Sequence, residues 1–273
     1  MRHQSCKDWP IVRRLVPTRD RLAAVAANAR NTPRAILFEL RRRRLARRYL
    51  RGSGFEIGAL HRPLRVPSGV TVRYVDRMDR ATLRRHYPEL ADHELVEVDV
   101  IDDGEKLGSL AESSADFIIA NHFIEHTEDP LGTLSNHLRV LRSGGILYLA
   151  VPDCRRTFDA GRRPTALAHL VDDHAQGPSR SRKAHLEEWA SLVERVPPTD
   201  VSARVCELDE QDYSIHFHVW TPTEFRALLQ YAHEQQHLRF TIEALRDNGQ
   251  EFIAILRRTG PDETHAQAGR DAS

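Results

Sequence analysis

The sequence contains few cysteines and no long hydrophobic run. Cys6, Cys154 and Cys206 are the three cysteines among 273 residues, and no two of them have the C-x-x-C spacing of zinc or redox sites. We therefore expect a reducing compartment and no disulfide framework. No stretch approaches the roughly 18 apolar residues of a membrane-spanning helix, and residues 1–20 lack the apolar run of a secretory signal. These absences predict a cytoplasmic protein without a membrane partner.

An excess of charge of one sign is also missing. Forty Lys and Arg residues stand against 39 Asp and Glu residues, which gives a formal net charge of +1. Global electrostatics therefore provide no reason to expect a nucleic-acid partner. The local exception is the run Arg41–Arg44, inside a basic, helix-prone segment. This run could form a patch for nucleic acid or phospholipid, but we favour a solvated helix face.

Strands and helices alternate from Phe55 onward. A helix is predicted from Asp79, and another begins at Pro130, whose fixed φ suits a first helical position. This alternation predicts an α/β fold with a doubly wound, mostly parallel sheet. The predicted strands of this part are residues 55–58, 70–76, 95–101, 115–121 and 146–153.

The alternation stops at residue 154 and resumes after residue 215. Because long unpatterned segments over a rigid sheet usually carry specificity, this polar stretch is predicted to be an insertion that forms a lid. Thr221 and Glu224 then form a predicted capping box at the start of a helix. Asn248-Gly249 predicts a hairpin between two terminal strands, residues 238–245 and 251–258. The expected organisation is a basic helical extension (1–51), a main domain (52–258) with an insertion (154–215), and a disordered tail (259–273).

The loop after the first strand has the first glycine of a nucleotide-binding loop and lacks the others. In GFEIGALHRPL, Ala59 and Leu60 follow Gly58, where a dinucleotide fingerprint would contain further glycines. Pro63 and Pro67 oppose a normal crossover helix. Gly58 either lets the backbone approach a ligand closely or is an ordinary turn glycine, and the residues alone leave both interpretations open.

The order of elements resembles the class I S-adenosylmethionine-dependent methyltransferases. The resemblance covers about residues 52–153 and 216–258, and it is sharpest in EIGALHRPL, VRYVD, ADFIIANHFIEHTEDPLGTL and LRSGGILYLAVPD. It implies a seven-stranded Rossmann-like sheet whose seventh strand is inserted antiparallel. These stretches look like predicted methyltransferases of bacterial glycan and polysaccharide gene clusters. The resemblance thus implies S-adenosylmethionine as cofactor and a small-molecule or glycan acceptor, methylated at oxygen or nitrogen.

The same resemblance implies a set of cofactor-binding residues. Glu56 would address the methionine amino group through water, and Leu60 would narrow the space beside the methionine. Asp76, eighteen residues after Gly58, can accept both ribose hydroxyl hydrogens, and Arg77 could stack on the adenine. The remaining candidates are Gly58 and Ala59 of the first loop, Asp102 or Asp103 for the adenine amino group, and Asn121 at the end of the fourth strand.

The residues after the fourth strand are candidates for catalysis. His122 directly follows the strand end, where this fold holds the acceptor, so it is the first candidate for a general base. Glu125 and His126 match a Glu-His pair that often supports the site in this family. A lone histidine is also common in packing or on the surface, and that alternative stays open for His122.

The remaining histidines do not predict a metal site. His216 and His218 share one face by alternation, but His-x-His is common in ordinary strands and no HExxH spacing accompanies it. We therefore predict no bound metal. A metal site would need further ligands beside His216 and His218, and the candidates for these are His169, His174, His185 or Asp153.

Two other functions remain open. Ala59, Leu60 and Pro63 are compatible with a non-catalytic scaffold of methyltransferase fold, and Arg41–Arg44 with an RNA methyltransferase that binds phosphates in a salt-sensitive way. A nicotinamide dehydrogenase is disfavoured because the required glycines are absent. The sequence carries no prediction of the oligomeric state.

Overall fold

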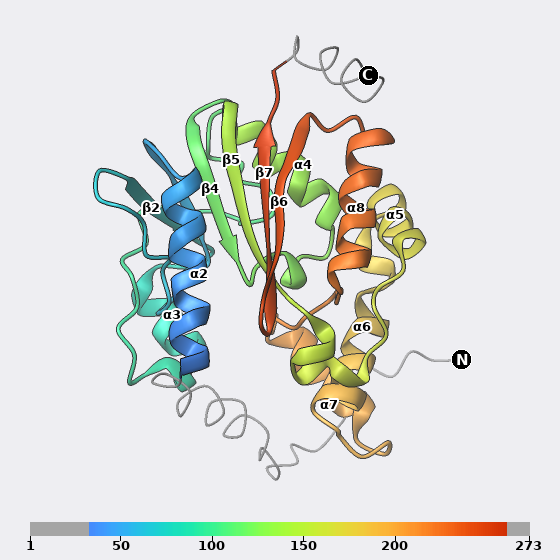
Figure 1. The fold of residues 1–273 in the computed structure, drawn as a ribbon. Helices are drawn as coiled ribbons and strands as arrows, with labels where there is room; N and C mark the ends of the chain where they lie inside the picture. The colour runs from blue at the N-terminus through green and yellow to red at the C-terminus, as the bar shows by residue number, and fades with distance from the viewer. Residues whose placement is uncertain (1–32, 261–273) are drawn as a thin grey trace.

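A seven-stranded sheet crosses the centre of the molecule (Figure 1). The computed structural model describes residues 33–260. The strand order is β3-β2-β1-β4-β5-β7-β6, and β7 runs antiparallel to both of its neighbours while the other ladders are parallel. This confirms the predicted doubly wound, mostly parallel sheet with a terminal antiparallel hairpin. The strands are β1 (Ser53–Ile57), β2 (Thr71–Asp76), β3 (Val100–Ile101), β4 (Ala115–Asn121), β5 (Leu141–Pro152), β6 (Phe240–Asn248) and β7 (Glu251–Arg258).

Helices cover both faces of this sheet and form the insertion. Both predicted helix starts are confirmed, because the side chain of Asp79 caps α3 and Pro130 occupies the first turn of α4. The α-helices are α2 (Pro33–Tyr49), α3 (Arg80–His86), α4 (Pro130–Val140), α5 (Leu167–Gln176), α6 (Arg182–Glu188), α7 (Val201–Glu210) and α8 (Pro222–Glu234). Shorter turns are η2 (Pro88–Leu90), η3 (Ile124–His126), η4 (Cys154–Arg156), η5 (Phe158–Gly161), η6 (Pro178–Arg180) and the π-helical η7 (Trp189–Val193).

The two faces of the sheet are covered by different parts of the chain. On one face, α4, α5 and α8 bury apolar side chains such as Leu134 and Phe225 in the larger core. On the other face, Ala46 of α2 and Leu50 directly after it are fully buried against Phe117 and other strand residues. The predicted N-terminal extension is therefore, over the part that the structure describes, an element of the core.

The connection between β1 and β2 contains no helix. Residues 58–70, all of them described, are turns and irregular backbone, as the prolines predict. β1→β2 and β4→β5 cross the sheet in opposite directions, so right-handed crossovers would place a β1–β2 helix on the face opposite α4. That face is the one that α2 covers together with Leu64 of the connection. Helix α2 thus replaces the missing crossover helix.

Two elements differ in length from the prediction. The third strand was expected over residues 95–101, but only Val100 and Ile101 pair with β2. The side chain of Asp99 accepts a hydrogen bond from the Tyr74 N–H (2.8 Å), which a longer ladder would give to a backbone carbonyl. The fifth strand was expected over residues 146–153, but β5 begins at Leu141, directly after α4 ends at Val140.

The predicted insertion is helical. It contains α5, α6, η7 and α7, and it has a small core of its own around Trp189, Leu208 and Phe217. The sequence had suggested an unpatterned segment, because its apolar residues are spread over several short helices rather than one periodic run. The capping box of α8 is confirmed, with Thr221 accepting from the Thr223 N–H and Glu224 accepting from the Thr221 N–H.

The terminal hairpin turns at Asn248-Gly249, as predicted. Gly249 has φ 81°, a left-handed conformation that glycine adopts without strain, and Asn248 pairs with Glu251 across the turn. Because β7 is antiparallel, its first residue, Glu251, lies opposite Pro152 at the carboxyl end of β5. A residue late in the chain is thereby placed at the edge where the parallel strands end.

No helix of residues 33–260 is long and apolar enough to cross a membrane. Of the two cysteines in this range, Cys154 is buried and free. The predicted disordered tail lies, from residue 261 on, outside the described residues.

Candidate active site

The carboxyl edge of the parallel strands gathers most of the predicted site residues. Glu56 and Gly58 lie at the end of β1, Asp76 at the end of β2, and Asn121 and His122 at the end of β4. In open α/β sheets, ligands bind at this edge. The structure thus brings together residues that the sequence spreads over 67 positions.

Glu56 is buried (1% exposed) and holds the β1–β2 connection in place. Its two carboxylate oxygens lie 2.9 and 3.1 Å from the Leu64 backbone nitrogen, which donates to them. Burial raises the pKa of Glu56 to about 7, although the Leu64 N–H and the charge of Arg42 oppose this increase. In this structure the buried Glu56 carboxylate therefore anchors the β1–β2 connection through the Leu64 N–H.

The position of Gly58 favours glycine because of its backbone conformation and not because of limited space. Its φ of 63° lies in the left-handed region, while a Cβ there would meet only a Phe123 carbon at 3.6 Å, an ordinary contact. Leu60 also has a positive φ, 49°, and its carbonyl accepts a hydrogen bond from the Val96 N–H. The loop that includes Ala59 is therefore tightly folded without the usual second and third glycines.

Asp76 and Arg77 at the end of β2 have different environments. Oδ1 of Asp76 accepts a hydrogen bond from the Arg77 N–H (2.8 Å), and burial raises the pKa of Asp76 to about 6. The guanidinium of Arg77 lies 2.7 Å from Oδ2 of Asp212 and 2.7 Å from Nε2 of His86. Arg77 therefore ties the end of β2 to the insertion, through Asp212 just after α7.

Asp102 and Asp103 both form turns after β3. Oδ2 of Asp102 accepts from the backbone N–H and the hydroxyl of Ser109, and Oδ1 accepts from the Asp103 N–H. Asp103 accepts from the Glu105 N–H and pairs with Lys106 Nζ at 2.7 Å. Asp103 pairs with a flexible, exposed lysine, so its carboxylate is the more readily released of the two.

Asn121 provides a test of whether a polar cofactor fits at this edge. Its carboxamide lies beside Glu56, whose ionised form it favours, yet neither amide atom has a hydrogen-bond partner of good geometry within the described residues. A buried unpaired amide costs about 1–3 kcal/mol, which a ligand with hydroxyl or amino groups would remove. With the partly buried carboxylate of Asp76 on β2, these residues fit a nucleoside-type cofactor.

His122 is held by a hydrogen bond to a carboxylate that the sequence did not reveal. Its Nε2 lies 2.7 Å from Oε2 of Glu251, and its φ is 51°. Glu251 in turn accepts two hydrogen bonds from Arg42, from Nε at 2.8 Å and from Nη2 at 2.5 Å, and one from the Asn248 side chain. Burial alone would raise the pKa of Glu251, but the bonds from Arg42 and His122 lower it to about 2. Glu251 is therefore an ionised carboxylate beside a half-exposed imidazole.

Arg42 corrects the interpretation of the four-arginine run. Its side chain is buried against Glu251, so the expected solvated helix face is wrong at this position, and the arginine is not available to phosphates. Arg41 and Arg44 are exposed, as expected. Arg42 could not have been separated from its neighbours by sequence alone. Glu251 could have been found, because an Asn-Gly hairpin places the next residue at the carboxyl edge of the sheet.

Glu125 and His126 lie in η3, three and four residues after His122. Glu125 is 1% exposed, and burial raises its pKa well above the usual value; its Oε1 lies 3.7 Å from Nδ1 of His122. Nδ1 of His126 lies 2.8 Å from the Ile215 carbonyl oxygen and 3.0 Å from Oγ of Ser214. Burial lowers the pKa of His126 to about 3. His126 thus joins η3 to the end of the insertion.

The two histidines of the His-x-His pattern, His216 and His218, have different partners. His216 pairs with Asp159 (Nδ1 to Oδ2, 2.7 Å), whereas His218 lies against His169 and His185. His174 pairs with Asp129, and Asp153 is held by Arg155. The two histidines of His-x-His therefore contact different partners, although they are two residues apart.

A separate groove of about 240 Å³ lies between α8 and the terminal hairpin. It is lined by Pro222, Thr223 and Arg226 of the helix and by Leu245, Arg246, Asp247 and Phe252 of the strands. None of the predicted cofactor or catalytic residues lines it.

Comparison with known proteins gives one family match. Residues 52–149 match the family model described as a methyltransferase domain, which covers β1 to most of β5 and supports S-adenosylmethionine as the cofactor. No curated protein matches the chain.

Solved structures with a similar fold share little sequence identity with this chain. A candidate S-adenosyl-L-methionine-dependent methyltransferase from Methanococcus maripaludis is 14% identical, covers 93% of this chain and 100% of its own, and has a TM-score of 0.48. A SAM-dependent methyltransferase from Aquifex aeolicus is 11% identical over 88% and 98% of the two chains, with a TM-score of 0.46. These likenesses carry no argument about the acceptor.

Proposed function

We propose that this chain is an S-adenosylmethionine-dependent methyltransferase that methylates an oxygen or nitrogen atom of a small molecule or glycan. The observation that carries the proposal is the position of His122, which follows β4 at the carboxyl edge and is held by Glu251. It is supported by the methyltransferase-domain match over residues 52–149. The glycan part depends on the resemblance to methyltransferases of bacterial polysaccharide clusters.

The residues that would hold the cofactor are Gly58, Asp76 and Asn121. S-adenosylmethionine supplies a methyl group on a sulfonium for in-line displacement, in which positioning provides much of the rate. Asp76 would accept the ribose hydroxyls, and its raised pKa of about 6 leaves it ionised at neutral pH. The Asn121 amide would gain the partners that it lacks.

The protein's own chemical contribution would be an oriented base. Because Nε2 of His122 faces the Glu251 carboxylate, the favoured neutral tautomer has its proton on Nε2 and its lone pair on Nδ1. Nδ1 would take the proton of the acceptor, and ionised Glu251 would stabilise the imidazolium that forms, as the carboxylate does in a catalytic triad. Arg42 keeps Glu251 ionised and fixes its orientation.

Cofactor binding is the direct test of this proposal. Isothermal titration of the full chain with S-adenosylmethionine should show one site, and Asp76→Asn should weaken it by about 10- to 150-fold, the loss of a hydrogen bond to a charged acceptor. Asp116→Asn is the matched control, since Asp116 begins β4 at the opposite edge of the sheet and pairs with Arg142. Absence of binding by the wild-type protein would favour the scaffold alternative.

Turnover requires a search for the acceptor. Release of S-adenosylhomocysteine should be screened over saccharides, hydroxylated and amino small molecules, and an RNA pool. Turnover on a saccharide or other small molecule supports the proposal, and turnover confined to RNA contradicts it in favour of an RNA methyltransferase.

A further inference from the structure

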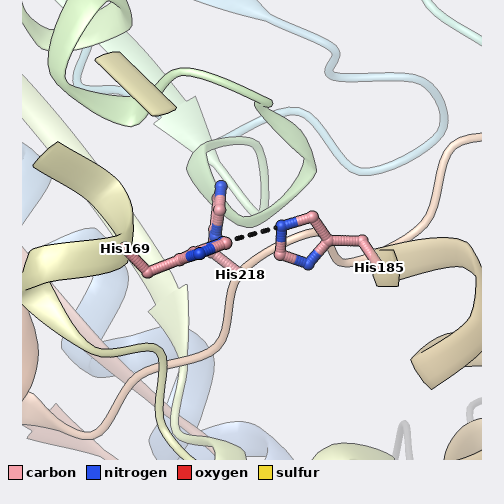
Figure 2. Close-up of side chains that lie close together, drawn as sticks. All are labelled: His169, His185 and His218. Atoms are coloured by element: carbon pink, nitrogen blue, oxygen red, sulfur yellow. Dashed lines mark hydrogen bonds between the residues drawn. The ribbon is translucent and has the colours of Figure 1, made fainter. Parts of the chain in front are cut away.

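Three histidines from three separate elements meet at the inner side of the insertion (Figure 2). His169 lies on α5, His185 on α6, and His218 in the segment before α8. One ring nitrogen of each lies within 4.8 Å of the others, and Nε2 of His169 is 2.9 Å from Nε2 of His185. His218 is buried, and the side chain of His185 is 11% exposed. Three imidazoles in this arrangement offer three nitrogen ligands to one point.

The carboxylate of Asp173 lies beside the imidazoles of His169 and His185. Asp173, one helical turn after His169, is 5% exposed, and its Oδ2 lies 3.1 Å from Nε2 of His169 and 3.9 Å from Nε2 of His185. In a tetrahedral zinc site the nitrogen ligands stand about 3.3–3.4 Å apart, given zinc–nitrogen bonds of about 2.0–2.1 Å. The separation of the two Nε2 atoms would need to increase by only a few tenths of an ångström.

His218 is already in the tautomer that a metal needs. Its Nε2 lies 3.3 Å from the Glu128 carbonyl oxygen, which can only accept, so the proton is on Nε2. Nδ1 then has a free lone pair, and it is buried without a hydrogen-bond partner among the described residues. Metal-bound histidines commonly donate their other ring N–H to a backbone carbonyl in this way.

The positive charge of the nearby Arg162 is compensated, because its guanidinium pairs with Asp159 and Glu188.

The neighbouring group of Glu125, His126 and His216 is less suited to a metal. The Nδ1 atoms of His126 and His216 face the Ile215 carbonyl and Asp159, which leaves their Nε2 atoms available, but the group offers only two imidazoles. Its third member is Glu125, and burial raises the pKa of this carboxyl well above its usual value, so that ionisation for a metal is opposed.

We propose that His169, His185, His218 and Asp173 bind one divalent ion of the zinc class, which fastens the insertion to the sheet edge. Three nitrogens and one oxygen from the protein complete a tetrahedral shell, which is typical of a structural zinc site rather than one with an open position. The ion would join α5 and α6 to the segment that leads into α8. This site takes no part in the proposed methyl transfer.

The test is metal binding by the chelator-treated full chain. Titration with Zn²⁺ should show one tight site and an increase in melting temperature, and Co²⁺ should give the intense visible bands of tetrahedral cobalt. Absence of saturable binding, or the weak bands of octahedral cobalt, in the wild-type protein would overturn the proposal whether or not any variant folds.

Variants locate the site. His185→Ala and Asp173→Asn should each weaken Zn²⁺ binding, His185→Ala by more than 100-fold, since loss of a second-shell partner alone costs about 10–100-fold. His174→Ala, which changes a histidine on the same helix that pairs with Asp129, and His216→Ala, in the neighbouring group, should bind as the wild type does. Binding that is lost in His216→Ala and kept in His185→Ala would contradict the assignment.

Discussion

The cluster around Glu251 and the cluster around His218 both bury polar side chains, but only in the first is the central group fully paired within the protein. Arg42, His122 and Asn248 all bond the Glu251 carboxylate, although Oδ1 of Asn248 has no partner among the described residues. In the second cluster, ring nitrogens face one another and Nδ1 of His218 is unpaired within the described range. Since unpaired buried polar groups are costly, a complete network indicates a preformed active-site support, and an incomplete one indicates a missing ligand.

The largest expected effect is on turnover, and it comes from substituting His122, the proposed general base beside Glu251. His122→Asn should lower turnover by about 10²–10⁴-fold with little change in cofactor affinity, because the general base is removed while asparagine tolerates the positive φ of this position. His237→Asn is a matched control, since His237 is an exposed histidine with a φ of 55°. Steady-state kinetics measure both, and equal turnover in the two variants would show that His122 is not a base.

Breaking the ion pair inside the complete network should reduce stability. Arg42→Met leaves Glu251 charged and buried, so the free energy of unfolding should decrease by about 3–5 kcal/mol. The double variant Arg42→Met/Glu251→Gln should recover part of this loss, because no unpaired charge remains. Urea denaturation of the single and double variants gives the coupling, and strictly additive losses would argue against the pair.

The stabilisation by Glu251 should also depend on pH. Its folded pKa of about 2 lies below the ordinary value of 4.5, so its contribution is present above about pH 4.5 and is lost as the pH falls toward 2. A difference of that size corresponds to about 3 kcal/mol. The gap in unfolding free energy between the wild type and Glu251→Gln should therefore narrow between about pH 5 and pH 2. A gap that stays constant over this range would mean that the carboxylate is not responsible.

The smallest effect is expected in the incomplete network. In chelator-treated protein, His218→Phe should change the free energy of unfolding by less than about 1 kcal/mol, because it removes an unpaired buried nitrogen along with one long hydrogen bond. With Zn²⁺ present the wild type should gain stability and the variant should not. A large loss in the metal-free variant would show that the cluster is satisfied without a ligand.

The sheet was predictable from sequence because local patterns determine it. Apolar strands such as residues 115–121, the proline at 130 and the Asn248-Gly249 turn each act over a few neighbours, and they led to the correct mostly parallel sheet and terminal hairpin. The β3 length was wrong because a single side chain, Asp99, replaces ladder hydrogen bonds. Such a substitution leaves no trace in hydrophobic periodicity.

Only those residues of the candidate site that lie at strand ends could be predicted from the sequence. Asp76, Asn121 and His122 follow strands and therefore share an edge, but the partners of His122 come from both ends of the described chain. Arg42 looks like its neighbours in an arginine run, and its burial is set by the tertiary position of α2. The arrangement of His169, His185 and His218 likewise depends on how short helices pack, which sequence spacing does not encode.

The pairing of Arg42 with Glu251 joins residues that are 209 positions apart. Since chains are synthesised from the N-terminus, α2 and its arginine are made well before the strand that carries the matching carboxylate. Until β7 has inserted beside β5, Arg42 has no Glu251 to neutralise it and His122 has no partner to orient its ring. A nascent or truncated chain that lacks β7 would thus contain every predicted cofactor residue and still be inactive. The proposed base would thus be complete only after β7 has paired with β5.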